Sequence, residues 1–163
     1  MYRERTLESK EVMITLNIIE KSEMPSEWLE QMKAYAAVPD GAQDSLLSAI
    51  LMRAVLSVQE VADKSLLACT IELREDDVED NTVRLYQTMS EVVSVTTPVG
   101  HRLYWEPRSN GIRVYDPSVV VTYKTEPREG DVVNLLPVVF QYATALYDGQ
   151  DTKTLASILS QCQ

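Results

Sequence analysis

The sequence predicts an α+β domain: antiparallel helices, one of them long and apolar, with a small antiparallel β-hairpin unit inserted before the C-terminal helices. Three observations lead to this prediction. Helical patterns dominate the first third of the chain, β-branched and aromatic residues separated by turn residues fill positions 66–125, and helical spacing then returns. The length of 163 residues suits one domain, so residues 1–163 are predicted to form a single domain.

The first third is predicted to be mainly helical. Residues 12–16 fit either a short strand or the start of a helix. Pro25–Ser26 offers a helix start, and residues 38–41 break the chain. Asp44 is then placed to cap a longer helix that runs to about Ser65.

This longer helix carries an apolar stripe at the spacing of a packed helix. The candidate subunit-packing residues on the stripe are Leu47, Leu51, Ala54 and Val58. Other sides of the helix are apolar as well, and such a helix needs cover on most sides. A neighbouring subunit or a central position in the core would supply that cover. No apolar run approaches the length of about 18 residues that spans a membrane, so no membrane segment is predicted.

The middle of the chain is predicted to form hairpins. Asn110 and Gly111 both tolerate positive φ, which predicts a type I′ turn between two strands. The predicted strands are 67–73, 83–86, 92–96, 112–115 and 119–123.

Two helices are predicted to follow the hairpins. Asn134 would cap the first, because Pro137 then falls in the first turn, where its missing N–H costs nothing. Gly149 would end this helix, and Asp151 would cap a final short one.

The charge balance limits the classes of partner. Fifteen basic and 25 acidic residues give a net charge of −10, which disfavours nucleic-acid binding through broad charge neutralisation. The N-terminal residues lack the apolar segment of a secretory signal. Two cysteines make no disulfide framework, which favours a reducing, cytoplasmic folding environment.

Half of this charge lies in residues 72–80, which hold six acids and one base. The candidate acidic loop consists of Glu75, Asp76, Asp77, Glu79 and Asp80. Such a run could bind Ca²⁺ or Mg²⁺ and serve a metalloenzyme, but it lacks the ligand spacing and mid-loop glycine of an EF-hand. A solvated loop is the favoured interpretation, and no metal site is predicted.

Catalysis has no support in the sequence. His101 is the only histidine, and neither Cys69 nor Cys162 belongs to a Cys-x-x-Cys pair. Glycine-rich phosphate loops and the Gly-x-Ser-x-Gly motif are absent from the sequence. We therefore predict no catalytic residue and no cofactor.

Residues 100–113 reverse the local charge, with three arginines against one glutamate. The candidate protein interface consists of Arg102, Tyr104, Trp105, Arg108 and Arg113. Arginine, tyrosine and tryptophan are enriched at protein interfaces. The segment is either a hairpin of solvated amphipathic strands or a surface for an acidic partner, such as the acidic loop of an adjacent identical subunit.

Three stretches in this order resemble the head–tail connector (adaptor or head-completion) proteins of tailed bacteriophages. They are residues 32–62 (MKAYAAVPDGAQDSLLSAILMRAVLSVQEVA), residues 83–100 (VRLYQTMSEVVSVTTPVG), and residues 119–127 (VVVTYKTEP) followed by 135–150 (LLPVVFQYATALYDGQ). The likeness does not reach residues 1–30 or 150–163. The chain also departs from the family at Lys124–Glu126, where Gly-Tyr is frequent, and at Asp148–Gln150, where Asn-Arg is frequent.

The resemblance implies a structural, non-enzymatic virion protein, made in the host cell cytoplasm. Identical subunits, commonly twelve, would form a ring beneath the portal protein, extend the DNA channel and dock the next ring or the tail. DNA would be passing cargo only, and no membrane would be involved. The alternative is a monomeric module that binds another protein through its arginine- and aromatic-rich hairpin.

Overall fold

The protein is built from helices and antiparallel sheets. The computed structural model describes residues 2–7, 10–39 and 43–163, with side chains described from Ile14 onward. Within these residues it has four α-helices and eight strands, and one helix is long and apolar, which confirms the predicted α+β class. Asp40 and Gly41 of the predicted chain break lie outside the described residues.

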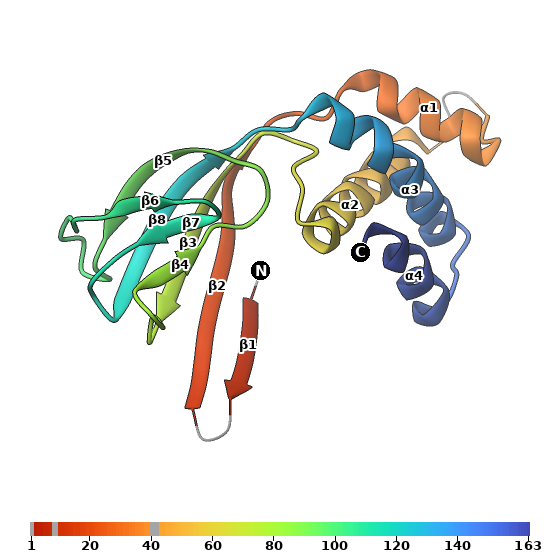
Figure 1. The fold of residues 1–163 in the computed structure, drawn as a ribbon. Coiled ribbons are helices and arrows are strands. Elements are labelled where there is room, and N and C mark those ends of the chain that lie inside the picture. The colour runs from red at the N-terminus through yellow and green to blue at the C-terminus, as the bar shows by residue number, and fades with distance from the viewer. Residues whose placement is uncertain (1, 8–9, 40–42) are drawn as a thin grey trace. The chain divides into compact units, whose positions relative to one another are not determined.

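The chain divides into two compact units (Figure 1). The sheet unit contains the residues up to Ser22 and Leu67–Glu126. The helical unit contains Glu23–Leu66 and Pro127–Gln163. Each unit is therefore assembled from two separate stretches of sequence.

The larger sheet has five antiparallel strands. In spatial order they are β1 (Tyr2–Leu7), β2 (Lys10–Lys21), β3 (Cys69–Asp76), β8 (Ser118–Thr125) and β5 (Met89–Thr96). Strand β2 corrects the prediction that the first third is mainly helical: around residues 12–16 the strand alternative is right, and it extends over 12 residues. The cause is pairing with β3, which places Ile14 and Leu16 on the buried face of the sheet.

Cross-strand partners build the core on that face. On neighbouring strands, Leu73 of β3 pairs with Leu16 of β2 and with Val121 of β8. Two residues away along β3, Ile71 pairs with Tyr123 of β8. None of the five is more than 6% exposed. Alternate residues of β3 point outward, so the sheet has one apolar and one polar side.

A second antiparallel sheet has three short strands. In spatial order they are β4 (Thr82–Arg84), β7 (Gly111–Arg113) and β6 (Glu106–Arg108). The predicted hairpin is present, but its loop residues are Ser109 and Asn110, because Arg108 pairs directly with Gly111. Neither loop residue has positive φ, so the predicted type I′ turn is wrong. Gly111 is needed for another reason: a Cβ there would collide with the carbonyl oxygen of Val83.

The hydroxyl of Tyr123 joins the two sheets. It accepts a hydrogen bond from the Tyr86 backbone N–H at 3.1 Å and donates one to the Tyr86 carbonyl oxygen at 3.3 Å. Tyr86 follows β4 by two residues. Val83, Ile112 and Val114 are fully buried on one side of the small sheet. The small sheet therefore has one core face and one outward face.

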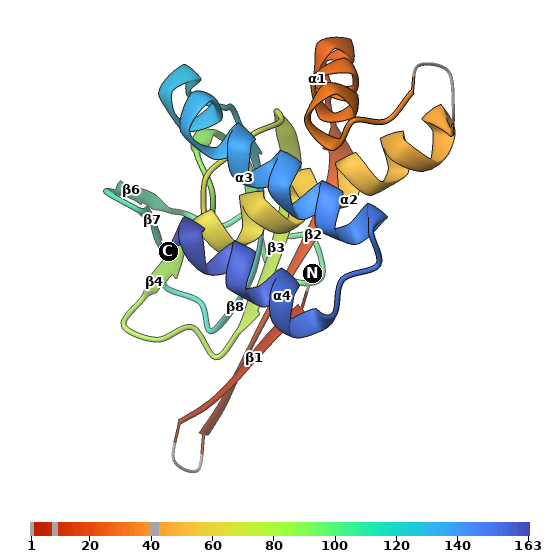
Figure 2. The ribbon, with the colours of Figure 1, turned by 90° about the vertical axis from the view of Figure 1, so that its right-hand side faces the viewer.

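Four helices and a 3₁₀ turn form the helical unit. They are α1 (Ser26–Ala36), α2 (Asp44–Ala62), α3 (Glu129–Tyr147), α4 (Thr152–Leu159) and η1 (Ser160–Cys162). Helix α3 packs against each of the other three helices (Figure 2). Its buried residues, including Val139, Phe140 and Ala143, form the centre of the unit.

Three predicted helix ends are confirmed. Pro25 precedes α1, and Gly149, with φ of +72°, follows the last residues of α3. Asp151 caps α4, because its carboxylate accepts the Thr154 N–H at 2.8 Å. This hydrogen bond stabilises the charged carboxylate and holds the pKa of Asp151 below its usual value.

The predicted start of α2 is wrong. Gln43 occupies the cap position, and Asp44 is the first helical residue. The Asp44 carboxylate lies 2.6 Å from the ammonium nitrogen of Lys33 on α1, and this interaction raises the pKa of Lys33. Asp44 therefore ties two helices together instead of capping one. Helix α2 also ends at Ala62, slightly before the predicted Ser65.

The predicted start of α3 is wrong as well. The helix begins at Glu129, before Asn134, and Pro137 lies in its interior. Glu129 and Asp131 place carboxylates in the first turn, where they favour an earlier start. Pro137 and Val133 are both exposed, so water can reach the carbonyl that lacks a helical hydrogen bond.

Helix α2 is long and apolar enough, by length and composition alone, to cross a membrane. The sequence had predicted no such segment. The central helix of a helical core satisfies the same criterion, and α2 has a fully buried stripe that includes Leu47 and Leu51.

Candidate functional site

The outward face of the small sheet gathers most of the predicted interface. Directly paired residues of antiparallel strands point to the same side. The pairs Glu106–Arg113 and Arg108–Gly111 therefore share the side opposite the buried Ile112. We call this surface the arginine–tyrosine face; it consists of Arg84, Tyr104, Glu106, Arg108, Arg113 and Tyr115.

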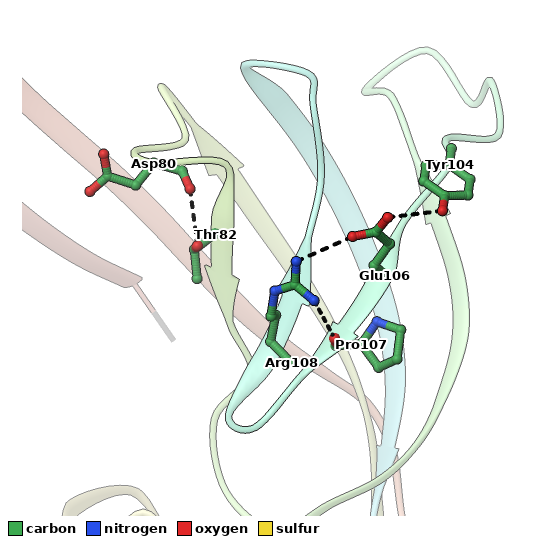
Figure 3. A network of polar contacts seen from close by, with 6 residues as sticks. All are labelled: Asp80, Thr82, Tyr104, Glu106, Pro107 and Arg108. Atoms are coloured by element: carbon green, nitrogen blue, oxygen red, sulfur yellow. Dashed lines mark hydrogen bonds and ion pairs between the residues drawn. The ribbon is translucent and has the colours of Figure 1, made fainter.

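A row of polar contacts runs along one edge of this face (Figure 3). The Tyr104 hydroxyl donates to Glu106 Oε1 at 3.0 Å, and Arg108 Nη2 donates to Glu106 Oε2 at 3.2 Å. Arg108 Nη1 also donates to the Pro107 carbonyl oxygen at 3.1 Å. The Glu106 carboxylate accepts from the Tyr104 hydroxyl and disfavours its ionisation, which raises the pKa of Tyr104.

Two tyrosines form the most exposed part of the face. The rings of Tyr104 and Tyr115 are stacked, with centroids 6.4 Å apart and planes 18° apart. Tyr104 is 70% exposed and Tyr115 is 55% exposed. An aromatic pair this open to water presents apolar surface that another molecule can cover.

The structure brings Tyr104, Arg108 and Arg113 together but leaves out two predicted interface residues. Arg102 lies on a separate β-bridge to Thr96 at the end of β5. Trp105 is half-buried and lies between Tyr104 and Glu106 in the chain, outside their row.

Sequence reasoning missed Arg84 and Tyr115, which belong to the same face. Arg84 lies on β4, which pairs with β7, and its guanidinium also lies 4.7 Å from the centre of the Tyr86 ring. The sequence signal that could have placed Tyr115 on this face is strand alternation: residues two apart point to the same side of a strand, and Tyr115 follows Arg113 by two residues.

The predicted acidic loop is only partly a loop. Glu75 lies within β3 and is 7% exposed, because its side chain points to the buried face of the sheet. Asp76 ends β3, and Asp77 and Asp80 have left-handed backbone conformations. Asp76, Asp77 and Asp80 are exposed and form no ion pair with a residue that the structure describes. Glu79 is half-exposed.

The same segment forms no recognisable metal site. Within residues 2–7, 10–39 and 43–163, no group of three or more His, Cys, Asp or Glu side chains is arranged to hold a metal ion.

The stripe proposed for subunit packing lies inside the helical unit. Leu47, Leu51, Ala54 and Val58 are all 0% exposed in the single chain, so none of them can contact another subunit in this fold. The central-core alternative accounts for these four residues. Leu46, which is 50% exposed, lies outside the buried stripe.

The cysteines and the histidine occupy unrelated places. Cys69 is buried, and its backbone N–H donates to Thr125 Oγ1 at 3.2 Å. Cys162 is half-buried, and this burial raises the pKa of its thiol. His101 is exposed. A hollow of about 290 Å³ beside Cys69 is lined by residues of β2, β3 and β8, including Lys21 and Lys124.

No family model and no curated protein matches the sequence. Solved structures do match. One is a chain in the neck of an empty gene transfer agent particle computed with C6 symmetry, with a TM-score of 0.63 and 13% identity over 91% of this chain and 95% of that chain. Another is a chain in the virion of a native gene transfer agent particle, with a TM-score of 0.60 and 14% identity over 91% of this chain and 94% of that chain. This chain shares their fold. The likeness to virion connector proteins is thereby confirmed at the level of the fold.

Proposed function

We propose that the protein is a structural component of a virion, located in the neck and assembled as a ring of identical subunits between the portal and the tail. The observation that carries this proposal is the extent of the fold match. It covers 91% of this chain and 95% of a neck chain, so the shared architecture includes both the sheet unit and the helical unit. The symmetry applied to that neck also fits a component present in several copies.

The charge of the chain fits a place beside moving DNA. A net charge of −10 repels phosphates, so a ring of such subunits would extend the DNA channel without holding the DNA. DNA is therefore cargo in this proposal and not a ligand.

The proposal assigns no catalytic step. Tyr104, Glu106 and Arg108 of the arginine–tyrosine face pair with one another on an open surface, whereas catalysis depends on positioned groups shielded from water. The face suits contact with protein, because arginine and tyrosine are typical of interfaces.

The test is deletion of the coding region in its own genome, followed by electron microscopy and mass spectrometry of purified particles. We expect the protein in normal particles, and heads without attached tails after deletion. Co-expression with the portal protein of the same genome should give a complex that contains a ring. Normal tailed particles after deletion, together with absence of the protein from purified particles, would refute a virion role.

A monomeric protein-binding module is the second candidate, and the exposed Tyr104–Tyr115 pair is the observation that favours it. The same experiment separates the two, because such a module would be missing from purified particles and would bind no portal protein.

A further inference from the structure

We propose that copies of this chain bind one another through the arginine–tyrosine face of one copy and the carboxylates of Asp76, Asp77 and Asp80 of the next. This inference rests on the proposed function, because it names the surface through which identical subunits would meet. The occupant of the face is thus a second copy of the chain.

The arginine–tyrosine face is a cationic surface on an acidic protein. It holds three arginines against the single carboxylate of Glu106, in a chain with a net charge of −10. Arg108 uses two of its five N–H donors in its bonds to Glu106 and Pro107. The ion pair between Arg108 and Glu106 is exposed, and exposed pairs contribute little to stability. Arg108 can therefore leave Glu106 at small cost and bind a carboxylate of another copy. Arg113 Nε is buried, and its N–H has no hydrogen-bond acceptor in the described part of the chain.

The acidic segment, residues 76–80, has the complementary charge and a fixed shape. The Val78 N–H donates to the Pro117 carbonyl oxygen at 2.9 Å, and the Thr82 N–H donates to the Glu79 carbonyl oxygen at 3.1 Å. These bonds hold the backbone while the carboxylates of Asp76, Asp77 and Asp80 remain exposed. A partner would therefore pay little ordering entropy to bind them.

The register of the small sheet keeps Arg108 away from the acidic segment of its own chain. Arg108 lies level with Arg84, since both pair with Gly111. Arg84 follows Asp80 by four residues, and Asp80 and Asn81 are left-handed residues that precede β4. Asp80 therefore lies beyond the Thr82 end of β4, whereas Arg108 lies level with the Arg84 end on a strand two places away, at strand spacings of about 4.8 Å. An ion pair needs about 4 Å. Asp80 and Arg108 are therefore better placed to meet between copies than within one.

The stacked tyrosines add the apolar part of the contact. Tyr104 is 70% exposed although its hydroxyl is already bonded to Glu106. Its ring, together with that of Tyr115, can be covered without breaking that bond. Arginine and tyrosine are among the residue types enriched at interface hot spots.

The test uses charge reversal in the full-length chain. Arg108→Glu lowers the net charge of the arginine–tyrosine face from +2 to 0, and Asp76→Lys reduces the negative charge of the three aspartate positions from −3 to −1. Asp76 is the acidic residue of choice because it lies outside the left-handed positions Asp77 and Asp80, which favour aspartate or asparagine. The matched control is Arg53→Glu, the same change at an exposed position of α2 in the helical unit. Circular dichroism and urea midpoints confirm that each variant folds.

Self-association is measured by sedimentation velocity and mass photometry, alone and with the portal protein. We expect Arg108→Glu and Asp76→Lys each to weaken it about tenfold or more, Arg53→Glu to leave it unchanged, and an equal mixture of the two charge-reversal variants to restore it. Restoration is expected because the Asp76→Lys copy keeps an unaltered arginine–tyrosine face and the Arg108→Glu copy keeps an unaltered acidic segment, so the two copies can form the wild-type contact.

Each other outcome has a definite meaning. If both variants form rings like the wild type, the proposed contact is wrong and the ring function stands. If the mixture restores dimers but no ring forms with the portal protein, the contact stands and the ring function is wrong. If the wild type stays monomeric under all conditions, both are overturned.

Discussion

Replacing Tyr123 by phenylalanine removes one oxygen atom from the junction of the two sheets and keeps the shape of the ring. Tyr123 is 0% exposed, and its hydroxyl serves both the N–H and the carbonyl group of Tyr86. A buried polar group that loses its partner costs about 1–3 kcal/mol. With two groups affected and some relaxation of the backbone, we expect the variant to lose roughly 2–4 kcal/mol of unfolding free energy.

Urea denaturation gives the magnitude, and hydrogen exchange of the Tyr86 amide gives the location. The matched control is Tyr147→Phe, which removes a hydroxyl that donates to Gln43 Oε1 at 2.9 Å on the surface. The control should change stability by no more than about 0.5 kcal/mol, because water replaces the lost bond. Equal stability losses in the two variants, or an unchanged exchange rate at Tyr86 in Tyr123→Phe, would refute the reasoning.

Three further predictions concern other parts of the fold. Gly111→Ala should lower the unfolding free energy by about 1–3 kcal/mol in urea denaturation, because its Cβ meets the backbone of β4; an unchanged midpoint would contradict this packing. Leu51→Ala should cost about 2–5 kcal/mol, whereas Leu46→Ala, at a half-exposed position, should cost far less, and similar losses would contradict the assigned stripe. Asp151 has a lowered folded-state pKa, so its contribution to stability is present above its unfolded pKa and is lost as pH falls through the folded pKa. The NMR signal of the Thr154 amide should therefore shift with pH as the Asp151 carboxyl group titrates. In the Asp151→Asn variant this pH dependence should disappear.

The sequence predicted the elements whose signals are local. Pro25, Asp151 and Gly149 mark helix ends through their own backbone and side-chain chemistry, and the structure places helix ends beside all three. Strand β2 was ambiguous because residues 12–16 have apolar side chains on both possible periods. Pairing with β3, more than 40 residues away in the chain, decides between them.

The candidate site depended on a register that local signals gave incorrectly. A turn at Asn110–Gly111 would place Tyr104 opposite Pro117, whereas the observed turn at Ser109–Asn110 places it level with Tyr115. Sequence patterns likewise identified the stripe of α2 as buried but could not say what covers it. That cover comes from the chain itself, because Leu51 and its neighbours on the stripe are fully buried without a second subunit.

The interleaving of the two units has a consequence for synthesis on the ribosome. Strand β3 is made well before β8, so one edge of the growing sheet stays open until residue 125 has emerged. Helix α2 waits even longer for α3, which begins at Glu129. Neither unit can finish folding from an N-terminal fragment, and a chain that stops early exposes the apolar stripe of α2 to aggregation and proteolysis. Unfinished chains would thus be removed before they reach the native fold, which would leave only complete copies.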